Sequence, residues 1–87
     1  MIPIPIEKDY SIAISTRPHK KYDIYYKEEY LLSFGDNRYS QYFDSTPIGF
    51  YSSVNHLDKE RRKRYFSRHK KENDKTSARY WSNKYLW

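Results

Sequence analysis

The sequence predicts a small α+β protein, in which a three-stranded antiparallel sheet packs against one basic helix and a C-terminal aromatic helix. Two observations predict this fold class. The first half of the chain alternates apolar and polar side chains, which is the period of half-buried strands. The second half places helix-capping residues ahead of runs with helical spacing. Its 87 residues suffice for a single domain with a thin core.

Three strands are expected in the first half of the chain. Residues 10–15 and residues 22–27 both alternate apolar and polar side chains. Residues 30–34 form the third strand, and the turn residues Gly35-Asp36-Asn37 end it. Such short connections favour an antiparallel meander, and a sheet of three strands needs a helix on one face to be stable.

Residues 1–9 precede this domain, which spans residues 10–87, and are expected to form an extended arm. Two prolines fix the backbone and remove hydrogen-bond donors, which favours an extended chain. Three isoleucines of such an arm project to one side, where they would dock along a neighbouring subunit as an added strand. The residues of this docking arm are Ile2, Pro3, Ile4, Pro5 and Ile6. A frayed terminus is the alternative.

Residues 38–57 are expected to be irregular, with a loop at 45–55. The segment is rich in aromatic residues, but Pro47 and Gly49 interrupt any regular element. A short helical turn before the loop is compatible with its sequence.

Two helices are expected after this segment. Asp58 is a favourable N-cap for the first, and Lys70 and Lys71 place positive charge in its last turn. Ser77 caps the second helix, which covers residues 78–86 and brings its aromatic side chains onto the sheet.

The net charge of +6 is concentrated in the second half of the chain. Residues 1–44 carry six Lys/Arg against seven Asp/Glu, whereas residues 45–87 carry eleven against four. Seven of these eleven bases form the basic face of the first helix, namely Arg61, Arg62, Lys63, Arg64, Arg68, Lys70 and Lys71. Such a run is typical of a surface that contacts phosphates or an acidic protein face. The alternative is that Arg64, Arg68 and His69 turn inward while the remaining bases are solvated.

Aromatic side chains take the place of aliphatic ones in this sequence. Seventeen residues are aromatic, eleven of them tyrosine, and there is no cysteine to form a disulfide or a Cys-based zinc site. So many rings exceed what a core of this size can hold, and exposed Tyr and Trp beside Arg are typical of protein interfaces. The rings expected to pack within the fold, partly against arginine, are Tyr39, Tyr42, Tyr65, Phe66, Trp81 and Trp87.

No pattern indicates catalysis, a metal or a cofactor. The chain has no nucleophile motif, and its two glycines exclude a glycine-rich phosphate loop. His56, Asp58 and His69 are ordinary metal-ligand types. However, His69 lies about three turns along the predicted helix, roughly 16 Å from His56, which excludes one shared ion. The start of the chain lacks the basic region of a secretory signal, and no apolar run reaches the length of a membrane span.

An ordered set of motifs runs through residues 10–87. It consists of a Phe34-Gly35 turn, Tyr39 and Tyr42, then His56, Asp58 and Arg61, an Arg64-Tyr65 pair with Arg68-His69, and a tail with Trp81 and Leu86-Trp87. In these motifs the chain resembles a family of small basic proteins encoded by large DNA viruses of algae and protists and by some tailed phages. Residues 45–55 are an insertion relative to that pattern. The resemblance implies a virus-encoded protein that forms part of the particle, and it implies no particular activity.

We therefore expect a non-enzymatic minor structural protein of a virus particle, found in the virion and, during assembly, inside the host cell. It would dock on other coat subunits through the arm and exposed aromatic residues, with its basic face toward acidic protein or the genome. The alternative is a sequence-nonspecific nucleic-acid-binding protein that uses the helix at residues 61–71.

Overall fold

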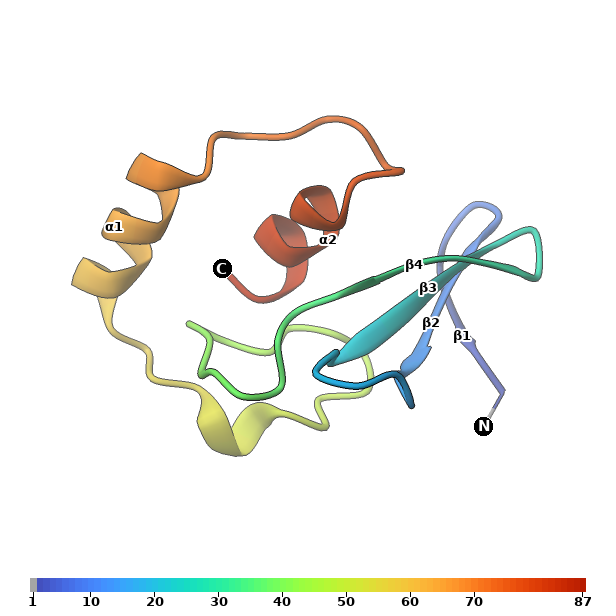
Figure 1. Ribbon diagram of the computed structural model, residues 1–87, viewed down its shortest axis with the longest axis horizontal. Coiled ribbons are helices and arrows are strands. Elements are labelled where there is room, and N and C mark those ends of the chain that lie inside the picture. Colours follow the sequence, from blue (N-terminus) through green and yellow to red (C-terminus); the bar gives the residue numbers. More distant parts are fainter. Residues whose placement is uncertain (1) are drawn as a thin grey trace.

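The computed structural model describes residues 2–87, which form a four-stranded antiparallel sheet followed by two α-helices (Figure 1). The elements are β1 (Ile4–Glu7), β2 (Tyr10–Ile14), β3 (Tyr22–Tyr26), β4 (Glu29–Phe34), a 3₁₀ helix (Ser52–Val54), α1 (Lys59–Arg68) and α2 (Ala78–Tyr85). The strands lie in the order β1-β2-β3-β4, so that each strand pairs with the one that follows it in the sequence. The α+β class and the antiparallel meander are confirmed, but the described sheet has one strand more than predicted.

The additional strand is β1, which comes from the segment expected to be a free arm. It pairs with β2 through Ile4 opposite Ile12 and Glu7 opposite Tyr10, with a register shift between Pro5 and Glu7. Proline is compatible with this position because β1 is an edge strand. Met1, the first residue of the expected arm, lies outside the described residues.

The isoleucines of this segment have different surroundings, although they were expected to share one side. Ile6 packs against the core, whereas Ile2 is 87% exposed and Ile4 is also exposed. The register shift accounts for the difference, since an irregularity in a strand interrupts the alternation of its side chains.

The core lies between one face of the sheet and α2. It consists of Ile12 from β2, Tyr22 and Ile24 from β3, Phe34 from β4, Trp81 from α2, and Leu86. The alternation of the strands places the four sheet residues on a single face. Trp81 is buried against them as predicted, and its indole Nε1 donates to the carbonyl of Lys75 at 2.8 Å. Burial of each isoleucine, leucine or phenylalanine side chain of this core contributes about 1.5–3 kcal/mol to the stability of the fold.

An ion-pair cluster joins β1 to the region around α2. The Glu7 carboxylate lies 3.2 Å from the ammonium of Lys84 on α2 and 3.5 Å from that of Lys75 just before it. The first and last parts of the described chain are thus held together by charge as well as by packing.

Helix α1 begins where the sequence predicts and ends earlier. The side chain of Asp58 accepts hydrogen bonds from the backbone N–H of Glu60 and Arg61, which confirms it as the N-cap. The helix ends at Arg68, and His69 adopts an extended backbone. Lys70 and Lys71 therefore follow the helix instead of forming its last turn. Ser77 caps α2 as predicted, with its side chain accepting from the N–H of Arg79.

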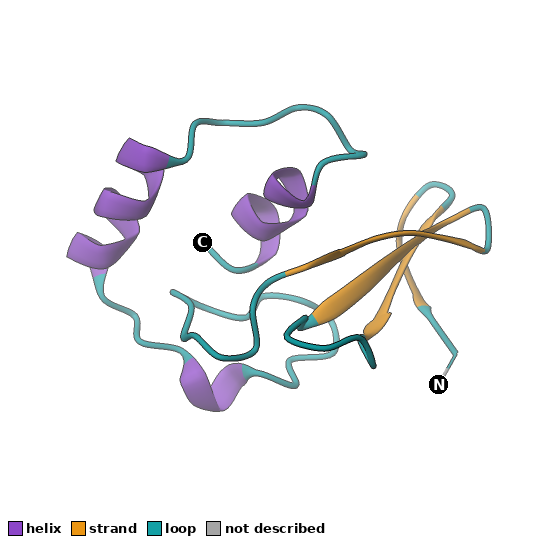
Figure 2. Ribbon diagram, viewed as in Figure 1, coloured by secondary structure: helices purple, strands orange, loops and turns teal. Residues whose placement is uncertain are grey.

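The basic helix does not cover the sheet, contrary to the prediction. Within residues 2–87, α2 is the helix that packs on a strand, β4, and α1 stands apart from the sheet (Figure 2). The physical reason is the composition of α1, whose apolar side chains are limited to Tyr65 and Phe66 and which has no buried residue. So narrow a stripe cannot cover a sheet face.

A buried polar network holds the irregular segment between β4 and α1. Lys21, 2% exposed, donates from its ammonium to the side-chain carbonyl of Gln41. Gln41 in turn donates to the side chain of Asn55 at 2.6 Å and to the backbone carbonyl of Tyr51 at 2.8 Å. Burial lowers the pKa of Lys21 from 10.5 to about 8.

The carboxylate of Asp44 is the second centre of this network. It accepts from the hydroxyl of Tyr22, from the N–H of Thr46 at 3.0 Å and from the N–H of Tyr51 at 3.0 Å. Burial, together with the bond to Asp44, raises the pKa of the Tyr22 hydroxyl. The segment at 45–55, expected to be a loop, contains the 3₁₀ helix and is fixed by these buried polar contacts.

Candidate functional site

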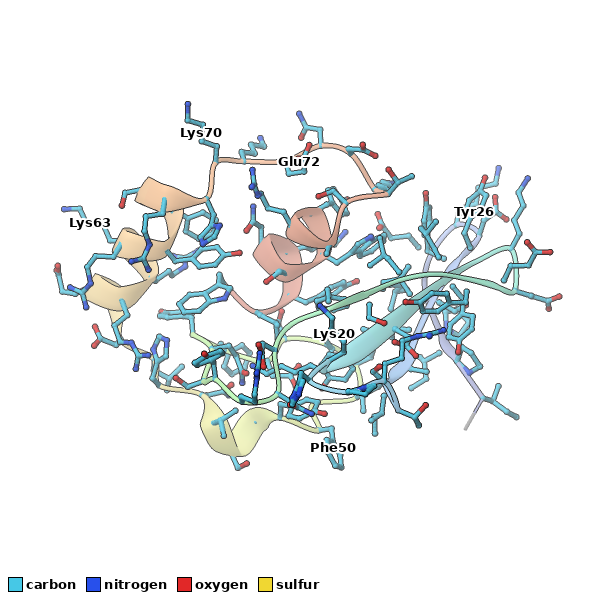
Figure 3. All side chains as sticks on the ribbon, in the orientation of Figure 1. Lys20, Tyr26, Phe50, Lys63, Lys70 and Glu72 are labelled. Carbon is cyan, nitrogen blue, oxygen red and sulfur yellow. The ribbon has the colours of Figure 1, made fainter. Side chains whose placement is uncertain are left out.

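The predicted basic face is exposed along the whole of α1. The side chains of Lys63 on α1 and Lys70 beyond it project away from the body of the protein (Figure 3). In the part of the chain that the structure describes, the ion pairs join Arg38 to Asp36 and join Lys75 and Lys84 to Glu7. None of the bases of the predicted face has a carboxylate within ion-pair distance there. The positive charge of this face is therefore uncompensated.

Two of these bases also anchor the helix. Arg62 donates from Nε to the carbonyl of Trp87 at 2.6 Å, and its guanidinium carbon lies 5.0 Å from the centroid of the Tyr42 ring. Arg61 donates to the hydroxyl of Ser40 at 3.2 Å. The contact of Arg62 with Tyr42 matches the expectation that arginine packs on aromatic rings. Outside the basic face, Arg17 does so on Tyr30, with its guanidinium carbon 3.7 Å from the ring centroid.

Three other bases of the predicted face lie on α1 and are free to contact a partner. The side chains of Lys63, Arg64 and Arg68 form no hydrogen bond or ion pair within residues 2–87, and all three are exposed. The alternative prediction, that Arg64 and Arg68 turn inward, is therefore wrong. His69 does turn inward, onto the ring of Tyr65.

A stack of aromatic rings attaches α1 to the C-terminal residues. The rings of Tyr65 and Trp87 are stacked, with centroids 4.3 Å apart and planes 4° apart. His69 stacks on Tyr65 with centroids 4.4 Å apart, and His56 lies 5.2 Å from Trp87. The hydroxyl of Tyr65 donates to the side chain of Asn83 on α2 at 2.7 Å. Burial raises the pKa of this hydroxyl.

The remaining rings of the predicted packing set differ in their surroundings. Phe66 contacts Tyr65 edge-on at 5.2 Å and remains partly exposed, and Tyr42 meets His56 edge-on at 6.1 Å. Tyr39, in contrast, is 65% exposed, and no ring of another described residue stacks on it. It lies on the turn after β4, where the guanidinium of Arg38 is 5.8 Å from its centroid.

A groove separates α1 from α2 and from the turn after β4. It consists of two adjoining cavities of about 410 and 370 Å³, which share Gly35, Asp36, Tyr65, His69 and Ser82 as lining residues. We call it the interhelical groove. Tyr39, Ser40 and Trp87 line the first cavity, and Lys20 and Arg79 line the second. Several residues of the ordered sequence motifs therefore line this groove, namely Gly35, Tyr39, Tyr65, His69, Leu86 and Trp87.

Gly35 shapes the floor of this groove. Its φ of +76° favours glycine, and a Cβ at this position would lie 2.9 Å from Cδ1 of Leu86 and 3.0 Å from Cβ of Lys21. Because glycine has no side chain, the turn at Gly35 lies closer to Leu86 than any other residue type at position 35 would allow.

The residues considered as metal ligands have other roles. His56 accepts at Nδ1 from the N–H of Asp58 at 2.9 Å, Asp58 caps α1, and His69 stacks on Tyr65. Among residues 2–87 no three acidic or histidine side chains are placed to hold a metal ion. In the same range no helix has the length and apolar character needed to cross a membrane.

Sequence reasoning missed several residues of the groove. Lys20 and Lys21 follow a turn and belong to no periodic pattern, so that no local signal distinguishes them. Arg79 and Ser82 could have been found, because they are three residues apart on the predicted second helix, beside the face that carries Trp81.

The chain has no match among family models, curated proteins or solved structures. Its function must be inferred from the charges, burial and contacts described above. The exposed basic helix and the adjoining interhelical groove are the two features from which such an inference can start.

Proposed function

We propose that this protein is a non-enzymatic binding protein whose helix α1 contacts the phosphates of nucleic acid. The observation that supports the proposal is the uncompensated charge of α1. Six of its ten residues are Lys or Arg and one is Glu, and four of the bases, Lys59, Lys63, Arg64 and Arg68, have no side-chain partner among the described residues. A folded chain of this size gains no stability from such a cluster, since like charges repel.

The geometry favours contact with the backbone over reading of bases. Contacts of Lys and Arg with phosphates carry no sequence information. Helix α1 is about 15 Å long and is anchored on one side by Tyr65 and Arg62, so that its outward bases can follow a phosphate backbone. We therefore propose binding without sequence specificity.

Titration of a labelled 20-base-pair DNA duplex at several salt concentrations tests this proposal. Neutralisation of each phosphate by a base releases counterions, so that the logarithm of the binding constant falls linearly with the logarithm of salt, by about 0.9 per contact. With the four free bases of α1 and the two lysines beyond it, we expect a slope of magnitude up to about 5.4. Absence of binding at low salt would overturn the proposal. Binding of polyglutamate in its place would identify an acidic protein face as the partner.

A second candidate is the role of a minor structural protein in a virus particle, which the sequence motifs led us to expect. The observation that favours it is the outer edge of β1. This edge is unpaired among the described residues, and Ile2 and Ile4 are exposed beside it. Proline at 3 and 5 removes donors from the edge, so that docking on a coat subunit would rely on apolar contact.

Exposed aromatic residues add to the surface available for such docking. They include Tyr39, Phe43 and Phe50. Mass spectrometry of purified virus particles tests this candidate: the protein should be present after extensive washing, and its absence would contradict a structural role.

A further inference from the structure

The interhelical groove has the size and the lining of a ligand site. Its larger cavity, about 410 Å³, falls within the range of small-molecule sites, about 300–1,000 Å³. Tyr39 lines this cavity and is 65% exposed, so that a face of its ring is available for stacking. The neighbouring wall is the stack of Trp87, Tyr65 and His69, which is held by its own contacts and by the bond from Tyr65 to Asn83.

The charges around the groove favour an anionic ligand. Lys20 and Arg79, both exposed, line its second cavity and have no ion-pair partner within residues 2–87. The acidic residue of the lining is Asp36, whose carboxylate is engaged by Arg38 at 2.7 and 3.0 Å. The negative charge of Asp36 is thus balanced, and the groove remains cationic.

The polar groups inside the groove match the edges of a planar heterocycle. The hydroxyls of Ser40 and Ser82 line the larger cavity, and a hydroxyl can both donate and accept a hydrogen bond. An aromatic platform, hydroxyls beside it and cations at the rim are the combination by which proteins hold an unstacked base with its flanking phosphates.

We propose that the interhelical groove binds one unpaired base of a single-stranded nucleic acid. Tyr39 stacks on the base, and Lys20 and Arg79 contact the adjoining phosphates. This inference rests on the proposed function, because α1 borders the groove through Tyr65 and would contact the backbone of the same strand. A duplex keeps its bases paired and stacked, so that it can use α1 but not the groove.

Binding of a 20-nucleotide oligothymidine and of a 20-base-pair duplex, measured by fluorescence anisotropy at equal salt, tests the proposal. The unmodified protein should bind the single strand more tightly. Tyr39→Leu should weaken single-strand binding about 5- to 150-fold, since stacking of a base contributes about 1–3 kcal/mol, and should leave duplex binding unchanged. Tyr39→Phe should retain the single-strand affinity.

The matched control is Phe50→Leu, which removes a ring of similar exposure, 61%, that does not line the groove. It should affect neither ligand. Equal effects of Tyr39→Leu and Phe50→Leu, or equal weakening of single strand and duplex by Tyr39→Leu, would overturn the base site. If the duplex binds with the expected salt dependence but single strands are not preferred, the base site fails and the proposed function stands. If neither ligand binds, both fail.

Discussion

The indole of Trp87 lies parallel to the phenol ring of Tyr65, with centroids 4.3 Å and planes 4° apart. Tyr65 is on α1 and Trp87 follows α2, so that this pair joins α1 to the C-terminal residues. No residue of α1 is buried, and the helix approaches no strand or other helix closely among the described elements. The attachment of the basic helix therefore depends on side-chain contacts: this stack, the hydrogen bond from Tyr65 to Asn83, and the hydrogen bonds that Arg61 and Arg62 donate.

Tyr65→Leu should detach α1 from the rest of the protein. The change removes stacking on Trp87 and His69, each contributing about 0.5–1.5 kcal/mol, and the hydrogen bond to Asn83, about 1 kcal/mol. We expect the free energy of unfolding in urea to fall by about 2–3 kcal/mol. Phe66→Leu, on the same helix but partly exposed, should cost less than half as much. Equal losses for the two variants would show that the stack does not hold the helix.

Asp58→Ala should shorten or unfold α1, because the first backbone N–H groups of the helix lose their acceptor. Asp58→Asn, which keeps an oxygen acceptor, should retain most of the helical circular dichroism at 222 nm. Hydrogen bonding to the N–H of Arg61 lowers the pKa of Asp58. Its contribution to stability is present above the ordinary carboxyl pKa and is lost as the pH falls through the lowered value. Helicity that stays constant in Asp58→Ala would argue against this cap.

Lys21 should make the protein more stable as the pH rises from 8 toward 10. The folded state releases the Lys21 proton near pH 8, whereas the unfolded chain retains it until about 10.5. Since the unfolded state binds more protons in this window, the free energy of unfolding increases by up to about 1.4 kcal/mol per pH unit. Above pH 10 the raised pKa of Tyr22 acts in the opposite direction.

Urea unfolding at pH 7.5, 8.5 and 9.5 measures this dependence. Lys21→Met should abolish the increase, whereas Lys20→Met, at the exposed neighbouring position, should retain it. The same pH profile for both variants would contradict the assignment to Lys21.

Gly35→Ala should destabilise the protein more than Gly49→Ala. Both glycines have positive φ, +76° and +62°, so that the backbone strain on substitution is similar, about 1 kcal/mol. A Cβ at 35 would lie 2.9 Å from Leu86, however, while at 49 the nearest atom is the Ser52 hydroxyl at 3.4 Å. Thermal unfolding should show a lower midpoint for Gly35→Ala. Midpoints that coincide would mean that the turn can move away from Leu86.

The parts of the fold that the sequence predicts are those with local signals. Alternation predicted β2 and β3, the turn signal at Gly35-Asp36-Asn37 marked the end of β4, and side-chain caps predicted the starts of both helices. The extended conformation of β1 was predicted, but its pairing with β2 was not, because the segment was expected to add as a strand to a neighbouring subunit. The end of α1 was placed too late because the stacking of His69 on Tyr65 has no sequence signature.

Of the two features of the candidate site, the basic run could be predicted from the sequence and the interhelical groove could not. The basic run from Arg61 to Lys71 is contiguous, so that its charge could be recognised directly. The interhelical groove could not, because its lining comes from the turn at 35–40, from α1 and from α2, which are distant in the sequence. The placement of α1 away from the sheet depends likewise on Trp87, 22 positions after Tyr65.

The salt dependence of duplex binding by two charge-matched variants tests the central claim, that α1 contacts phosphates, most directly. Lys63→Gln/Arg64→Gln removes two free bases of α1, and Lys8→Gln/Lys27→Gln removes two bases from hairpin turns at the end of the sheet away from α1 (Figure 1). Both lower the net charge equally. The α1 variant should reduce the magnitude of the salt slope by about 1.8, or about 0.9 per lost contact, and the hairpin variant should leave the slope unchanged. Equal slopes for the two variants would contradict the claim.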